Sequence, residues 1–312
     1  MSGEGPQPMD LPPVGPAGLL SPRPNLRLLG RLVPRRGNLG LSLGILLVGS
    51  MAVLAIFAPL LQAHSPIHAN SAVALQGPSS EYWFGTDTLG FDIFTRVLYA
   101  PRVDLVVPVI ATAISFGIGV VGGAWLGYQA GRRGWKGFVS EHIMRFIDIL
   151  QAFPVFVFAL ALVATLGRGE TNIVYALVVL EAPIFLRLTR SSVQAVRQRT
   201  FVDAAVCAGN SERRIIFRHI LPNSLGPALI NASVLTGSGI LITASLSFVG
   251  AGVQPPKPEW GYMVATGAEN MVTGQWWPAV FPGLFIGLTV LGFALIGDAV
   301  AHRLNPDRRD RG

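Results

Sequence analysis

Polar side chains recur at seven-residue intervals in one long apolar segment of the C-terminal half. Ser224, Asn231 and Ser238 share one face of a helix, because seven residues complete two turns. Hydroxyl and amide groups can hydrogen-bond water or a passing solute, whereas the same groups are costly when they face lipid. Two interpretations therefore stay open: these residues line a hydrated translocation path, or they form hydrogen bonds between neighbouring helices.

The chain lacks the motifs that would let it hydrolyse ATP or perform other catalysis by itself. Its two lysines, Lys136 and Lys257, follow Trp and Pro, so no G-x-x-x-x-G-K-[ST] phosphate-binding loop exists. The zinc-protease pattern H-E-x-x-H and the hydrolase pattern G-x-S-x-G are also absent. His64 and His68 are four residues apart but have no third ligand nearby. We therefore predict no catalytic residue, no metal site and no cofactor bound by this chain.

A charged segment between two apolar segments carries the most informative pattern. Ala204, Ala205 and Ala208 fall at i, i+1 and i+4, which gives a predicted helix a face of small side chains. Gly209 can end that helix in the left-handed conformation. A second, amphipathic helix is predicted to follow, with Pro222 in the first turn of the next span. We expect a short cytoplasmic helix that docks closely onto a partner protein, because a plain charged loop needs none of these features in this order.

Three motifs in this order resemble those of ABC importer permeases. The run D-A-A-V-C-A-G at 203–209, followed by I-L-P at 220–222, is similar to the E-A-A motif of that family. The runs F-G-T-D at 84–87 and L-S-F-V-G-A-G-V-Q-P-P at 246–256 resemble the C-type subunit of the dipeptide/oligopeptide (and nickel) importer subfamily. The likeness covers roughly residues 38–306. Asp203 replaces the usual Glu, Phe91 the usual Arg and Thr95 the usual Ser.

The resemblance implies an all-α integral membrane protein with six transmembrane helices and the type I ABC importer permease fold. Such a subunit forms half of the translocation path for peptides or similar small solutes. Its implied partners are a homologous second permease, two subunits that bind ATP and Mg, and an extracytoplasmic solute-binding protein. The residues implied to couple it to the ATPase are Asp203, Ala204, Ala205, Gly209, Ile220, Leu221 and Pro222.

Composition supports a membrane protein independently of the resemblance. The 312 residues are 51% hydrophobic and 13% charged, whereas soluble domains carry roughly 25% charged residues. We expect spans at about 40–63, 105–130, 146–167, 171–187, 220–253 and 275–297. The fourth is the weakest, because it is short and holds Glu181 and Pro183. The fifth is longer than a bilayer requires and must tilt, break or protrude.

The positive charges predict the orientation of the spans. With the N-terminus in the cytoplasm, all but four of the 24 Lys and Arg residues lie in cytoplasmic segments. The expected domains are a disordered basic cytoplasmic tail (1–36), the first transmembrane helix with an external segment (37–104), the permease domain (105–300) and a cytoplasmic tail (301–312). The protein would then be a multi-pass protein of the cell inner (plasma) membrane with both termini cytoplasmic.

Small residues and rare charges inside the spans allow further predictions. Two glycine series, Gly119–Gly123–Gly127 and Gly283–Gly287, predict faces where helices pack closely. We expect Asp148 to pair locally with Arg145. Glu181 lies near enough to Arg187 to find a partner or reach the membrane surface. The alternative for both acids is a proton relay, but without a ladder of acids and histidines the sequence gives proton-driven transport little support. The rival interpretation is a self-sufficient secondary transporter, which requires internal repeats and intramembrane ion sites; the sequence shows neither.

The charge asymmetry leads to a prediction about topology. In a Cys207→Ala background, a cysteine at Ser80 should react with an impermeant thiol reagent added outside the cell, because 64–104 is predicted to be external. A cysteine at Ser191 should react only after the membrane is permeabilised. The opposite labelling pattern would contradict the orientation.

Overall fold

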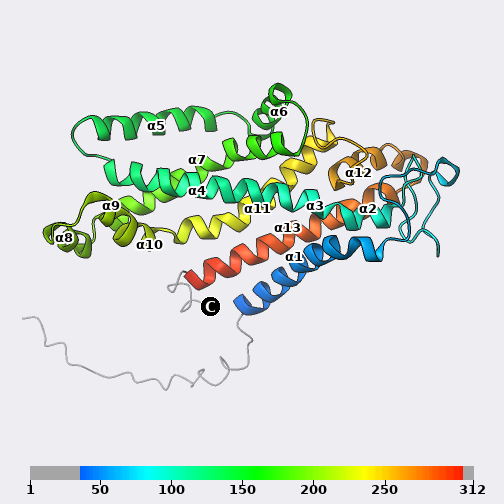
Figure 1. Cartoon of the computed structure of the whole chain (residues 1–312), viewed down its shortest axis with the longest axis horizontal. Coiled ribbons are helices and arrows are strands. Elements are labelled where there is room, and N and C mark those ends of the chain that lie inside the picture. The colour runs from blue at the N-terminus through cyan, green and yellow to red at the C-terminus, as the bar shows by residue number, and fades with distance from the viewer. Residues whose placement is uncertain (1–35, 305–312) are drawn as a thin grey trace, which may run out of the picture. The chain divides into compact units, whose positions relative to one another are not determined.

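The computed structural model describes residues 36–304 (Figure 1). The predicted N-terminal tail, 1–36, lies outside this range except for its last residue. Most of the predicted C-terminal tail, 301–312, also lies outside it. In the described part the chain is helical, and its one β-bridge joins Thr86 to Asp92. The prediction of an all-α protein is therefore confirmed.

Five helical segments in the described range are long and apolar enough to cross a membrane. One of them is built from three consecutive helices, α2, α3 and α4. A sixth span exists if the bent pair of α5 and α6 counts as one. The segments are α1 (Arg36–Leu61), α2 (Ile93–Tyr99) with α3 (Pro101–Asp104) and α4 (Val106–Gln129), α7 (Glu170–Arg197), α11 (Gly226–Phe248) and α13 (Trp277–Leu304), and the bent pair is α5 (Trp135–Gln151) with α6 (Val155–Leu166).

The third predicted span, 146–167, is not the single straight helix that the apolar run suggested. Helix α5 ends at Gln151, α6 begins at Val155, and the two axes differ by 93°. Pro154 is the N-cap of α6; a proline disfavours the helical conformation of the residue before it, so the break falls here. α5 is amphipathic and leaves Phe138, Phe146 and Ile149 exposed.

The fourth and fifth predicted spans differ from the structure in opposite ways. The fourth, predicted as short and weak, forms the 28-residue helix α7 and continues through Pro183. The fifth is broken near its start: a π-helical turn, η3 (Ile215–Ile220), leads into the short α10 (Leu221–Ser224) before α11. Pro222 and Pro227 each lie in the first turn of a helix, where a missing N–H costs least.

Helices α4 and α7 make the most extensive helix–helix contact in the described range. Their backbones meet at the predicted glycine series. A Cβ on Gly123 would lie 2.6 Å from the carbonyl oxygen of Leu186, and one on Gly127 would lie 2.7 Å from that of Arg190. A Cβ on Gly119 would likewise be too close to α7, since it would overlap the Cβ of Phe185. The prediction of close packing at this series is confirmed.

The second glycine series, Gly283 and Gly287, does not pack against another helix backbone of this chain. A Cβ on Gly287 would have no neighbour within 4 Å, and one on Gly283 would only reach Val264 at 3.9 Å. Instead α13 meets α1 at Gly44 and Gly292, where a Cβ on Gly44 would lie 2.7 Å from the Gly292 carbonyl oxygen. The sequence pattern thus found the right helix but the wrong face for contact within this chain.

The expected pair of Asp148 with Arg145 is also wrong. The partner of Asp148 is Arg187, which donates to its carboxylate and so links α5 to α7. Arg187 does not pair with Glu181, which stays buried between helices.

The shorter helices gather at the two ends of the described bundle (Figure 1). α8 (Thr200–Cys207), α9 (Glu212–Arg214), η3 and α10 lie at one end, which we call the α8 end. The other end, the α12 end, holds α2, α3 and α12 (Trp260–Ala268); the chain there also forms η2 (Ser71–Val73) and η4 (Met271–Thr273). Asp92 and Glu259 cap α2 and α12 by accepting from backbone N–H groups in their first turns.

The glycine contact between α4 and α7 generates a prediction about stability. Gly123→Ala places a methyl group 2.6 Å from a backbone oxygen, so the helices must move apart. Overpacking of this kind costs about 1–3 kcal/mol, and we expect a lower thermal midpoint of the transporter in lipid nanodiscs. Gly117→Ala is the matched control, because a Cβ there meets nothing within 4 Å. Equal midpoints for the two variants would contradict the packing argument.

Candidate functional site

The segment from Arg197 to Ser224, which we call the coupling segment after its predicted role, is bound to the end of α4. Arg197, the last residue of α7, donates through Nη1 to the carbonyl oxygens of Tyr128 at 2.8 Å and Ala130 at 3.0 Å. The last carbonyls of a helix have no partner within it, so the guanidinium satisfies groups that would otherwise lack one. The Tyr128 ring also lies 4.8 Å from the Arg132 guanidinium and 5.5 Å from that of Arg197.

Helix α8 divides its small residues between two environments. Ala205 is buried with Val202 against η3, whereas Ala204 and Ala208 are exposed. The expected common face of Ala204, Ala205 and Ala208 is therefore split: Ala205 packs inside this chain. The exposed side of α8 also carries Asp203, which lies in its first turn. An exposed carboxylate in the first turn interacts favourably with the helix dipole.

Gly209 ends α8 in the way its sequence position predicted. Its φ is +75°, in the left-handed region that favours glycine. The Gly209 N–H donates to the Val206 carbonyl oxygen at 2.9 Å, and the Asn210 side-chain amide donates to that of Ala205, also at 2.9 Å. The turn is thus held by backbone and side-chain hydrogen bonds, which fixes the direction in which the chain leaves α8.

The residues after this turn return the chain to the bundle. Ile220 is fully buried with Ile215 and Ile216, Leu221 is partly buried, and Pro222 is exposed at the start of α10. These apolar contacts attach α8 to the ends of α4 and α7, where Tyr128 and Val193 belong to the same cluster. The coupling segment therefore packs onto the α4–α7 pair and does not hang free from it.

An ion-pair cluster gives the coupling segment a second attachment. Arg132 donates to Glu212 at 2.6 Å and Lys136 at 3.4 Å, so the α4–α5 connection is tied to the start of α9. The hydrogen bond from Arg132 holds the pKa of Glu212 below its usual range. These side chains are partly exposed, so the pairs contribute modestly to stability.

Sequence reasoning did not single out Arg197, Tyr128 or Arg132. Tyr128 and Arg132 are four residues apart, but α4 ends at Gln129, so the i, i+4 rule for helices could not predict their contact. Arg197 gave no signal, because its acceptors lie 67 and 69 residues earlier in the chain.

The polar residues predicted to share a path do not all share one surface. Ser224 is buried in α10 and donates to the Ile220 carbonyl oxygen at 2.8 Å. Asn231 and Ser238, beyond the break before α11, are partly exposed. Ser245 continues the seven-residue series and is exposed, with its hydroxyl donating to the Leu241 carbonyl oxygen at 2.7 Å. We call the surface of Asn231, Ser238 and Ser245 the α11 polar stripe.

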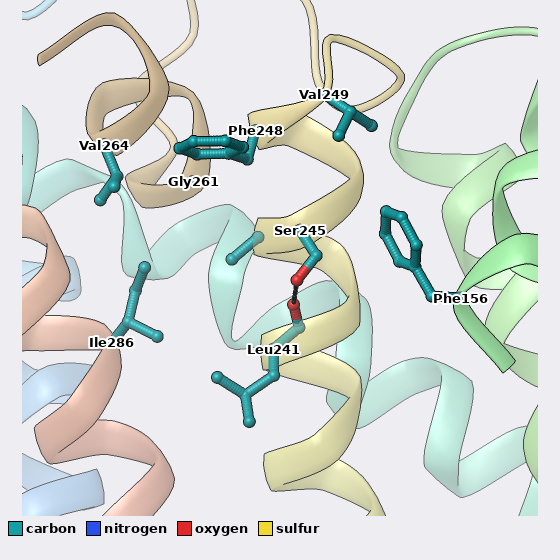
Figure 2. A pocket seen from close by; sticks show the side chains of 9 residues that line it. Phe156, Leu241, Ser245, Phe248, Val249, Gly261, Val264 and Ile286 are labelled. Atoms are coloured by element: carbon teal, nitrogen blue, oxygen red, sulfur yellow. Dashed lines mark hydrogen bonds between the residues drawn. The ribbon is translucent and has the colours of Figure 1, made fainter. Parts of the chain in front are cut away.

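An apolar cavity of about 300 Å³ lies where the α11 polar stripe reaches the α12 end. Figure 2 shows Ser245 between apolar side chains contributed by α6, α11, α12 and α13. The stripe and the cavity together form a surface with a few hydrogen-bonding groups in apolar surroundings. The cavity is lined by Phe156, Leu241, Ala244, Ser245, Phe248, Val249, Gly261, Val264 and Ile286.

Phe91, one of the departures from the family pattern, has a defined contact at the α12 end. The Arg96 guanidinium lies 4.3 Å from its ring centroid, a geometry in which the ring attracts the cation. Arg96 also donates to the carbonyl oxygens of Pro66 at 3.1 Å and Pro256 at 3.3 Å. The aromatic ring thus helps to hold a buried arginine that joins the segment before α2 to the segment before α12.

Several curated proteins are similar to this chain along most of its length. The dipeptide transport system permease protein DppC of Alkalihalophilus pseudofirmus is 42% identical over 263 residues, which cover 84% of each protein. The probable D,D-dipeptide transport system permease protein DdpC of Escherichia coli K12 is 40% identical over 82% of this chain and 84% of its own. The glutathione transport system permease protein GsiD of Pectobacterium atrosepticum is 39% identical over 74% of each.

The fold is similar to that of a solved ABC transporter. An inward-facing structure of the MetNI methionine ABC transporter contains a chain that aligns with a TM-score of 0.54 and 16% identity, over 67% of this chain and 96% of its own length. Residues 119–310 match the family described as the binding-protein-dependent transport system inner membrane component. This chain is thus a membrane permease subunit, and it belongs to the binding-protein-dependent transport system inner membrane component family of ABC importers.

Proposed function

We propose that this chain forms half of the translocation path of an ATP-driven importer for peptides or similar small solutes. The observation that carries the proposal is the coupling segment: a short helix with one exposed side, fixed by Arg197 and apolar contacts to the ends of α4 and α7. The permease relatives support a peptide solute, since their names refer to the transport of dipeptides and glutathione.

The proposed partners supply what this chain lacks. A homologous second permease would complete the path, two ATP-binding subunits would hold ATP and Mg, and an extracytoplasmic binding protein would deliver the solute. The exposed side of α8, with Asp203 and Ala204, is the proposed contact with an ATP-binding subunit. The membrane orientation proposed from the positive charges puts this end and both termini in the cytoplasm.

In this proposal α8 moves as a rigid body together with the ends of α4 and α7. Movement of the ATP-binding subunits would push the exposed side of α8, while its buried side moves with α4 and α7 because Ala205 and Val202 are packed there. The turn at Gly209 and the contacts where the chain rejoins the bundle at Ile220, Leu221 and Pro222 keep α8 at a fixed angle to α4 and α7. Well-packed contacts of this kind transmit displacement because packed interiors are not continuously deformable.

The proposed path surface is the α11 polar stripe. It differs from the set predicted from the sequence because Ser224 is buried and Ser245 is exposed on the same face. Asn231, Ser238 and Ser245 would face the second permease across a hydrated path. The cavity beside Ser245 would then accept apolar parts of a solute, since its lining is almost entirely hydrocarbon.

The Gly209 turn gives a direct test of coupling. Gly209→Val forces a β-branched residue to positive φ, a strain of about 1–3 kcal/mol, and should abolish uptake of a labelled dipeptide at normal abundance of this chain. Gly209→Asn is the matched control, because asparagine tolerates the left-handed conformation and a Cβ there meets nothing within 4 Å. Full uptake by the valine variant would remove the main support for the coupling role.

The Arg197 anchor gives a second test. Arg197→Ala removes two hydrogen bonds to the end of α4, so α8 should move independently of the bundle. We expect co-purification of the ATP-binding subunits to persist while solute-stimulated ATP hydrolysis falls several-fold. Arg199→Ala, at an exposed position two residues later, should leave both unchanged. Normal stimulation in Arg197→Ala would show that the anchor does not transmit the movement.

A further inference from the structure

A set of buried polar residues, used by neither the coupling segment nor the α11 polar stripe, lies inside the bundle. These residues come from α3, α4, α7, α11 and the N-cap of α12. Each is at most 4% exposed. We call them the buried polar seam: Asp104, Thr112, Ser115, Glu181, Thr243, Ser247 and Glu259.

The seam begins at the α12 end with two carboxyl groups in contact. Glu259 and Asp104 hydrogen-bond each other, and the Ser247 side chain lies beside Glu259. Asp104 accepts from the Trp260 N–H at 3.0 Å, and Glu259 accepts from the Gly261 N–H at 2.9 Å. Burial raises the pKa of Glu259. Two carboxyl groups in a direct hydrogen bond share a proton, because two carboxylates would repel each other.

The seam reaches Glu181 where α4, α7 and α11 meet. Glu181 projects from α7 toward the hydroxyls of Thr112 and Ser115 on α4. Gly239 of α11 leaves just enough room, since a Cβ there would lie 3.2 Å from Glu181 Oε1. The same Cβ would lie 3.2 Å from Pro108 on α4. The three helices therefore enclose this carboxyl group, and α11 closes it off.

No basic side chain of the described bundle neutralises Glu181. Helices α6 and α11 carry no charged residue, and on α7 the nearest base, Arg187, binds Asp148. Helix α4 also carries no charged residue, and Asp104, the last residue of α3 before it, is itself an acid bound to Glu259. In the part of the chain that the structure describes, both Glu181 oxygens lack a hydrogen-bond partner of good geometry, as do the Thr112 and Thr243 hydroxyls.

A carboxyl group in this setting is stable only when it is neutral. An ionised carboxylate that is buried without a partner costs far more than a neutral one, so the group takes up a proton. Acids inside a membrane bundle are accordingly rare and usually mark a proton or ion pathway.

We propose that Glu181 is a proton-binding site, and that the packing of α11 against α4 and α7 seen here is its protonated form. Any arrangement in which α11 moves away would bring water to the carboxyl group and favour release of the proton. By linkage, the packed arrangement loses stability as the pH rises, because only the protonated form fits it. The site is independent of which solute the importer carries.

Infrared spectroscopy of the assembled transporter in lipid tests the protonation state without requiring transport. The spectrum should contain the carbonyl stretch of a protonated carboxyl group that disappears in Glu181→Gln and shifts in Glu181→Asp. Glu141→Gln is the matched control, since Glu141 is exposed on α5, and it should leave that band unchanged. A spectrum in which neither Glu181 variant alters a protonated-carboxyl band would overturn the proposal.

A pH series of thermal midpoints tests the linkage. Glutamine has the shape of a protonated glutamic acid but cannot ionise, so Glu181→Gln should be less sensitive to rising pH than the wild type. Glu141→Gln should follow the wild type. Identical pH profiles for wild type and Glu181→Gln would show that this carboxyl group does not release a proton when α11 moves. Failure of peptide uptake would leave both measurements intact, so this site and the proposed function can fail separately.

Discussion

The close contact of the α4 and α7 backbones is the constraint on which the rest of this structure depends. Inside lipid, helices gain nothing from the hydrophobic effect against each other, so attraction must come from close packing. Three glycines provide it: without side chains at Gly119, Gly123 and Gly127, the α7 backbone comes within contact distance of α4. Because the two helices run together along this series, their ends and their polar side chains are held in fixed relative positions.

The coupling segment inherits its position from this pair. Arg197 ends α7 and reaches the last carbonyls of α4, a reach that exists only because the glycine contact brings these ends together. The apolar cluster that packs against α8 joins Ala124 and Tyr128 of α4 to Val193 of α7. A helix that would be marginal alone, at eight residues, is thus stabilised by tertiary packing.

Helix α11 meets the α4–α7 pair over a smaller contact and carries two different kinds of polar residue. On one side, Gly239 closes the space around Glu181. On the other, the α11 polar stripe remains accessible. One helix that both covers a buried acid and borders a proposed path offers a physical link between solute passage and protonation, since displacement of α11 changes both environments at once.

The sequence by itself determined the membrane character, the helical class, the glycine face on which α4 packs closely, and the positive-φ turn at Gly209. Each of these rests on local composition or spacing, and a backbone that needs positive φ selects glycine directly. Tertiary structure alone decided the partner of Asp148, the inward position of Ala205, the burial of Ser224 and the isolation of Glu181. These depend on which faces of distant helices meet. The break at α10 shows why spacing failed for Ser224: a seven-residue period predicts a common face only while one helix continues without interruption.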